Sequence, residues 1–301
     1  MVLDALTKAP AQIFEQVAEF QREQLVYCHN HETSLKAIFG IHTIVLGLTL
    51  GGTRMWHYVN KAEAPRNVLR LSRGMTCKAA TLGLNLGGGK AVIICDAKKL
   101  NSKVLLRKFG QLINNLNGKY ITVEDVTMTT KDMEYVRMET KHVAGLPESM
   151  GGSGDSSPVT AYGTYMGMKA AAKEAFGSAS LAGKRITVQD VDSYSLCALD
   201  TTITHLKCRV IVGCANNQLA RENEHSPKLV RCGMVYNSDF LLNAGCLINV
   251  YSEMTGGSRQ GALAQTSNIY DYILQVLNRA EREKSHPKWL PFVKSKSASK
   301  P

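Results

Sequence analysis

Two lysines and one aspartate have the residue types and spacing that could support chemistry in this sequence. Lys90 follows three glycines in GLNLGGGKAVIICD (residues 83–96), Lys78 lies on a predicted helix before them, and Asp125 follows a predicted strand. In a partly buried cleft, one ammonium could bind a substrate carboxylate. Desolvation and the neighbouring charge could lower the pKa of the other, making it a general base. Asp125 would be a second proton-transfer group, although all three residues could equally be ordinary surface charges.

The glycine stretch does not match a phosphate-binding loop. A Walker loop needs Ser or Thr directly after its lysine and opens a helix, whereas Ala91 follows Lys90 and a strand pattern comes next. Glycine also lets a backbone approach a small ligand closely. We therefore interpret Gly51–Gly52 and Gly87–Gly89 as places that admit a substrate, with Lys90 at the start of a strand.

Composition and charge bound the class of protein. The chain has 301 residues, 44% hydrophobic and 20% charged, which is typical of a globular protein with a sizeable core. The net charge of +11 is spread along the chain and is not interleaved with aromatic residues. This favours a protein that handles anionic small molecules over one that binds nucleic acid.

Cysteine spacing and the N-terminus bear on metal sites and location. The eight cysteines form no CxxC pair, so we expect reduced thiols packed in the core and no metal site. No apolar run reaches membrane-spanning length, and the first residues resemble neither a signal peptide nor a transit peptide. The expectation is a cytoplasmic protein without a membrane or nucleic-acid partner.

The first half of the sequence alternates helical and strand patterns. This alternation predicts an α/β fold. Helices are expected over residues 10–27, from Pro65 to Gly83, and over 102–118; strands are expected within 35–52, at 90–95 and at 120–126.

The Gly/Ser/Pro cluster at residues 147–158 is the natural boundary between two domains. We expect a substrate and catalytic domain at 1–146, a nucleotide-binding domain at 147–265, and a C-terminal helix with a basic tail at 266–301. In the second half, helices are predicted at 159–177 and 267–284, and strand-like runs at 183–191, 208–216 and 233–251.

Several long blocks resemble one enzyme family. LGGTRMW (50–56), RLSRGMTCKAA (70–80), LNGKYITVEDV (116–126), GSGDSSPVTAYGTYMGMKAAAKEAFG (152–177) and NAGCLINVYSEM (243–254) are similar to the leucine/phenylalanine/valine/tryptophan dehydrogenases of the glutamate dehydrogenase superfamily. The resemblance covers nearly the whole chain to about residue 280. It implies an N-terminal substrate domain with a mixed sheet flanked by helices, a truncated Rossmann-like domain for NAD, and a homo-oligomer. The implied reaction is reversible oxidative deamination of an apolar L-amino acid to the 2-oxo acid and ammonia.

The resemblance also implies roles for individual residues. Lys78 would bind the substrate carboxylate, Lys90 would activate the attacking water, and Asp125 would accept protons. Other matching positions would orient the substrate (Gly51, Gly52, Met75, Asn243), line an apolar side-chain pocket (Leu50, Val123, Leu247, Val250), or contact the nicotinamide half of the cofactor (Thr160, Ala198, Asn216, Asn217). An apolar pocket of this kind suits branched aliphatic substrates first and aromatic ones next.

One departure from the family concerns the cofactor. After Val188–Gln189 the family has a Gly-rich turn for the pyrophosphate, but here Asp190 follows and no glycine occurs between Gly183 and Gly213. The sequence reads as though the first βαβ crossover of the nucleotide-binding domain were missing. Three alternatives stay open: an NAD-dependent dehydrogenase, a pseudoenzyme that binds an amino acid or acts as a scaffold without NAD, and a variant that folds poorly.

Smaller departures occur elsewhere in the chain. Residues of another type stand where the family usually has Asp, Pro or Gly: Thr43, Leu48, Thr127, Asp200 and Cys246.

Overall fold

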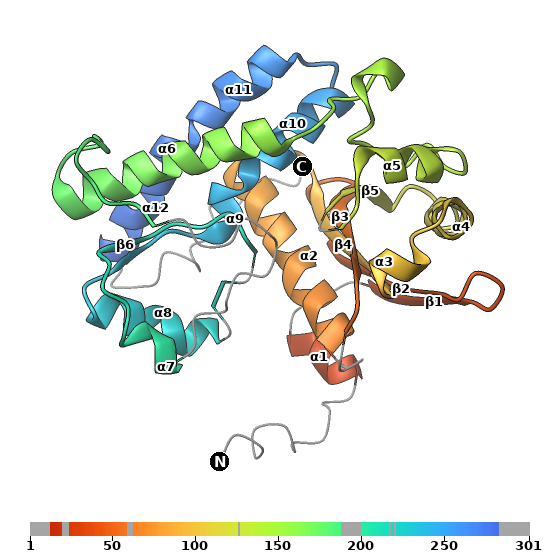
Figure 1. The fold of residues 1–301 in the computed structure, drawn as a ribbon, viewed down its shortest axis with the longest axis horizontal. Coiled ribbons are helices and arrows are strands. Elements are labelled where there is room, and N and C mark those ends of the chain that lie inside the picture. Colours follow the sequence, from red (N-terminus) through yellow and green to blue (C-terminus); the bar gives the residue numbers. More distant parts are fainter. Residues whose placement is uncertain are drawn as a thin grey trace, which may run out of the picture. The chain divides into compact units, whose positions relative to one another are not determined.

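The computed structural model places the chain in two compact units (Figure 1). It describes residues 13–19, 24–58, 63–125, 127–187, 200–216, 218–219 and 221–282. The first unit comprises residues 1–79 and 85–147, and the second comprises 80–84 and 148–301. Each unit is considered by itself below.

A five-stranded mixed sheet organises the first unit, as the sequence predicted. Its strands lie in the order β1-β2-β4-β3-β5. β1 pairs antiparallel with β2 and β2 with β4, whereas β3 runs parallel to both β4 and β5. The strands are β1 (Gln24–Asn30), β2 (Leu35–Thr43), β3 (Thr49–Trp56), β4 (Gly87–Ile94) and β5 (Tyr120–Glu124).

Each face of this sheet packs against different helices. On one face, α4 (Lys103–Asn114) and α5 (Thr130–Arg137) complete a core in which the Phe39 and Phe109 rings stack 5.2 Å apart. On the other face, Val68 of α2 (Glu63–Thr81) packs with Val92 of β4. Because side chains alternate along a strand, Lys90 shares the α2 face with Val92. Two short helices, α1 (Ile13–Glu19) and α3 (Ala97–Leu100), complete the unit.

Two predictions in the first half need correction. The helix expected over 10–27 ends at Glu19, and Leu25 lies on β1. Pairing of β1 with β2 along its whole length outweighs the helical spacing of apolar residues there. The glycines at 87–89 form the first residues of β4 and not a loop before it, so Lys90 is the fourth residue of its strand.

The second unit is mainly helical. α6 (Ser157–Phe176) packs against α10 (Ala244–Met254), α11 (Arg259–Ser267) and α12 (Ile269–Arg282). A Cβ at Gly163 would lie 2.8 Å from a methyl carbon of Ile269, so glycine there allows close helix packing. The remaining elements are η1 (Glu148–Met150), α7 (Asp200–Ile203), α8 (Glu222–Arg231), α9 (Asp239–Leu242) and a parallel pair formed by β6 (Val210–Ile211) and β7 (Val235–Tyr236).

Several predictions for the second half are wrong. Residues 239–251 form α9 and most of α10, because a run of apolar residues does not distinguish a buried helix from a strand. Residues 184–187 form no strand, and the rest of the strand expected at 183–191 lies outside the described residues. Cys208, Cys214 and Cys232 are exposed and are not core thiols, and Cys197 lies outside the described residues.

Within the described ranges, no helix combines the length and apolar character that crossing a membrane requires.

Glycine at position 88 is required for packing between β4 and α2. A Cβ on Gly88 would overlap the Ser72 carbonyl oxygen and the Thr76 amide nitrogen, which are backbone atoms of α2. Gly74, on the same helix, has no atom within 4 Å of its would-be Cβ, apart from its own helical neighbourhood. We expect Gly88→Ala to lower the free energy of unfolding by at least about 2 kcal/mol, because helix and strand must separate.

The matched substitution is Gly74→Ala, which should raise that free energy by about 1 kcal/mol because alanine is the better helix former. Urea denaturation followed by circular dichroism measures both changes. Equal stability of Gly88→Ala and the parent chain would contradict the close packing of β4 on α2.

Candidate active site

Parallel pairing of three strands positions the central residues of the site. β3 lies between β4 and β5, and Thr53 pairs with Ala91 on one side and with Glu124 on the other. Lys90 immediately precedes Ala91, and Asp125 immediately follows Glu124. These two residues therefore come from strands about 10 Å apart, with β3 between them.

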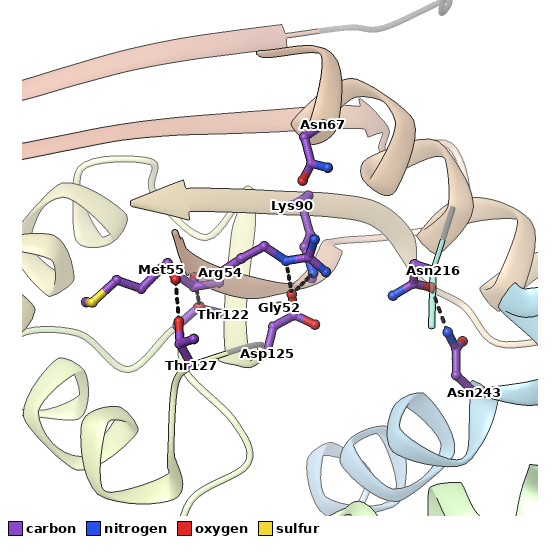
Figure 2. Close-up of polar contacts among 12 residues, drawn as sticks. Gly52, Arg54, Met55, Asn67, Lys90, Thr122, Asp125, Thr127, Asn216 and Asn243 are labelled. Atoms are coloured by element: carbon purple, nitrogen blue, oxygen red, sulfur yellow. Dashed lines mark hydrogen bonds and ion pairs between the residues drawn. The ribbon is translucent and has the colours of Figure 1, made fainter. Parts of the chain in front are cut away.

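The Lys90 side chain crosses β3 to reach Asp125 (Figure 2). Its Nζ donates a hydrogen bond of 2.6 Å to Asp125 Oδ2. The crossing runs above Gly52: a Cβ there would lie 3.1 Å from Lys90 Nζ and 2.7 Å from Asp125 Cβ. A larger residue at position 52 would push the ion pair apart, so glycine is required where the lysine passes.

Arg54 is a third member of this cluster. It lies two residues after Gly52 on β3, and its Nε donates to the same Asp125 Oδ2 at 3.2 Å. The exposed fractions are 3% for the Lys90 side chain, 13% for Arg54 and 18% for Asp125. We name these three residues the ion cluster; its formal charge is +1.

The two cations determine the state of the carboxyl group. Burial by itself would raise the pKa of Asp125, but the charges of Lys90 and Arg54 and their hydrogen bonds outweigh it and hold the pKa well below its usual range. Asp125 is therefore ionised at neutral pH and accepts hydrogen bonds only.

Lys78 adds positive charge on the helix that covers this face. It is 5% exposed and lies two residues beyond Thr76, which packs over Gly88. Lys90, Arg54 and Lys78 thus place three cations on the face that bears Asp125. Such a surface suits a small anion, and a carboxylate is the simplest one.

Most of the glycines in these two stretches allow close packing of the chain. A Cβ on Gly51 would overlap the Gly89 carbonyl oxygen, and one on Gly89 would lie 2.7 Å from the Tyr120 ring. Close packing by itself therefore requires glycine at positions 51, 88 and 89. Backbone contact of Gly51 or Gly52 with a substrate stays a prediction.

Three further predicted substrate residues belong to the first unit. Leu50 and Val123 are buried, and alternation along β3 and β5 puts them on the face that bears Gly52 and Asp125. Met75 lies half-buried on α2. The apolar pair therefore shares a sheet face with the ion cluster.

The second unit holds the remaining predicted residues. Asn243, between α9 and α10, donates through Nδ2 to the Cys214 carbonyl oxygen and to Asn216 Oδ1, both at 2.7 Å. Leu247 and Val250 are buried on α10. Thr160 on α6 donates to the Ser156 carbonyl oxygen at 3.1 Å. Asn217 and Ala198 lie outside the described residues.

Sequence reasoning missed Arg54. The available signal was its spacing: residues two apart on a strand share a face, and Gly52 had already been placed at the site. Arg54 reaches Asp125 because β3 pairs with β5. This pairing joins segments that are distant in the sequence, and residue spacing alone does not predict it.

Comparisons with known proteins place the chain among dehydrogenases. Residues 15–142 match the family described as "Glu/Leu/Phe/Val dehydrogenase, dimerisation domain". Leucine dehydrogenase of Thermoactinomyces intermedius is 42% identical over 326 residues, covering 90% of this chain and 89% of that protein. Phenylalanine dehydrogenase of Lysinibacillus sphaericus is 36% identical over 328 residues, covering 89% and 85%. The crystal structure of L-tryptophan dehydrogenase from Nostoc punctiforme superposes with a TM-score of 0.72 at 32% identity, covering 91% and 94%.

The leucine dehydrogenase alignment also contains a substantial gap. It runs over 326 positions, whereas 90% of 301 residues is about 271, so roughly 55 positions face gaps in this chain. The similarity nevertheless extends across both units. The sequence identity is also well above the level at which two proteins share only a fold. The chain belongs to the Glu/Leu/Phe/Val dehydrogenase family.

Proposed function

We propose that this chain is an amino-acid dehydrogenase that acts on an apolar L-amino acid, branched-chain or aromatic, and on its 2-oxo acid. The observation that carries the proposal is the buried Lys90–Asp125 pair formed across Gly52. Proteins named for leucine, tryptophan and phenylalanine dehydrogenase activity are similar along about 90% of the chain. A homo-oligomer in the cytoplasm is part of the same proposal.

Each side chain of the site has a distinct task in this proposal. Lys78 holds the substrate carboxylate as a buried point charge. Asp125 receives a proton from the substrate amino group through a carboxylate oxygen, and Lys90 orients the water that attacks the imine carbon. Leu50 and Val123 exclude water from the substrate side chain, which favours apolar substrates over charged ones.

NAD is the hydride acceptor that the family implies, and the residues present do not fit a whole dinucleotide. A pyrophosphate site in a Rossmann-like domain needs a Gly-rich turn between a strand and a helix. The sequence has no glycine between Gly183 and Gly213, and residues 184–187 form no strand. Asn216 and Asn243 form a polar pair that could orient a nicotinamide amide, but this leaves the diphosphate unheld. A nicotinamide held by this pair alone would lack the fixed position beside the substrate that hydride transfer requires.

A second candidate function follows from that misfit. A chain with a complete ion cluster and an incomplete dinucleotide site would bind an amino acid or 2-oxo acid without converting one into the other. The roughly 55 missing alignment positions favour this pseudoenzyme function.

NADH titration distinguishes the two functions. For the dehydrogenase we expect saturable fluorescence enhancement of NADH at micromolar concentration, and turnover of leucine, valine, phenylalanine or tryptophan. Calorimetric titration with the matching 2-oxo acids runs in parallel. Binding of a 2-oxo acid without NADH binding up to millimolar concentration would establish the pseudoenzyme, and binding of neither would overturn both functions.

Gly52→Ala tests whether activity or ligand binding depends on the contact that Lys90 makes with Asp125 above Gly52. The added methyl displaces Lys90 and Asp125 from each other, and a displacement near 1 Å at a catalytic pair costs about 100-fold in rate. We expect kcat/KM to fall by about that factor, or 2-oxo acid affinity to fall at least tenfold if the chain turns nothing over.

The control is Gly74→Ala, whose methyl would lie more than 4 Å from all described atoms outside its own stretch of helix and should leave both quantities unchanged. Full activity in Gly52→Ala would show that the geometry above Gly52 is not used.

Oligomeric state is a separate prediction. Light scattering coupled to gel filtration should give a mass that is an integral multiple of 32.9 kDa and at least twice that value. A mass of 32.9 kDa at micromolar concentration would reject the homo-oligomer.

A further inference from the structure

The hydrogen bonds of Asp125 are distributed unequally between its two carboxylate oxygens. Lys90 Nζ and Arg54 Nε both donate to Oδ2, at 2.6 and 3.2 Å. Among the described residues, no hydrogen bond reaches Oδ1. One oxygen is thus held from two sides, while the other accepts no hydrogen bond from the part of the chain that the structure describes.

We propose that Arg54 is a positioning residue, which fixes the rotation of the Asp125 carboxylate so that Oδ1 is presented to the substrate amino group. The proposal rests on the proposed function, because it gives Asp125 a reacting partner. It adds a residue and a task to that function: Arg54 orients the group that exchanges the proton and does not touch the substrate.

The position of Asp125 in the fold explains why it needs such support. β5 ends at Glu124, so the backbone of Asp125 lies just beyond the strand ladder. Its backbone is anchored by a turn in which the Met128 N–H donates to the Asp125 carbonyl oxygen at 2.9 Å. The carboxylate torsion of an aspartate is broad, so one contact from a flexible lysine leaves it free to rotate. A planar guanidinium on β3 provides a second contact from another direction.

The titratable groups around Asp125 come from three strands and one helix. Lys90 on β4 and Arg54 on β3 lower its pKa, whereas burial raises it. Tyr120 on β5 donates its hydroxyl hydrogen to the Gly51 carbonyl oxygen, and its own pKa is raised by burial and by the charge of Asp125. Lys78 lies on α2, which covers the same face. Removal of Arg54 should therefore change both the rotation and the acidity of Asp125.

NMR titration of the carboxyl carbons in 13C-aspartate-labelled protein tests this directly, with Asp125→Asn to assign the signal. In Arg54→Met we expect the pKa of Asp125 to rise by about one unit or more, since a neighbouring opposite charge typically lowers a carboxyl pKa by that much. Arg54→Lys should give a smaller rise. The matched control is Arg107→Met, which removes a surface arginine paired with Glu139 at 2.5 Å and should leave Asp125 unchanged.

Kinetics give a second readout in an active chain. Loss of positioning should lower kcat at least tenfold in Arg54→Met with KM changed less than threefold, and Arg54→Lys should restore part of kcat. An unchanged Asp125 titration in folded Arg54→Met overturns the proposal about Arg54. A parent chain that binds neither NADH nor a 2-oxo acid overturns the proposed function instead, and the NMR result still decides whether Arg54 controls Asp125.

Discussion

The contact between Lys90 and Asp125 across β3 is the constraint on which the first unit depends. A lysine can bridge two strands only if the strand between them carries no side chain at the crossing, and Gly52 meets that condition. Burial of the lysine in turn requires a carboxylate within hydrogen-bonding distance, because an unpaired ammonium in the interior is very costly. Strand order, one glycine and one ion pair are therefore mutually dependent.

The same dependence extends to the packing of α2. Gly88 lets the helix lie directly on β4, and this contact keeps Lys78 on the face that bears the ion cluster. The opposite face has a conventional aromatic core, with Phe39 against both Phe109 and Tyr120. The face that packs against α4 and α5 thus provides much of the hydrophobic stabilisation, while the face covered by α2 bears the ion cluster.

Local signals in the sequence predicted several helix ends and the central side chains of the site. Pro65 lies in the first turn of α2 and Gly83 lies two residues beyond its end, while Gly118, with φ of 81°, follows α4 where a stop was expected. Residue types and spacing singled out Lys78, Lys90 and Asp125, the family resemblance implied their roles, and the structure puts all three on one side of the sheet. The errors of the sequence analysis concern strand pairing, which a local pattern of residues does not determine. Pairing with β2 turned Leu25 into a strand residue, and the neighbouring position of β5 brought Arg54 to Asp125.

The buried ion pair also affects how such a chain changes through mutation. Removing one partner of a buried pair typically costs about 3–5 kcal/mol, a large share of the stability of an ordinary domain. Lys90 and Asp125 would therefore be retained by selection for folding alone, even in a descendant that had stopped turning substrate over. Persistence of these two residues along a lineage would then record the stability of the sheet, independently of whether the reaction itself survives.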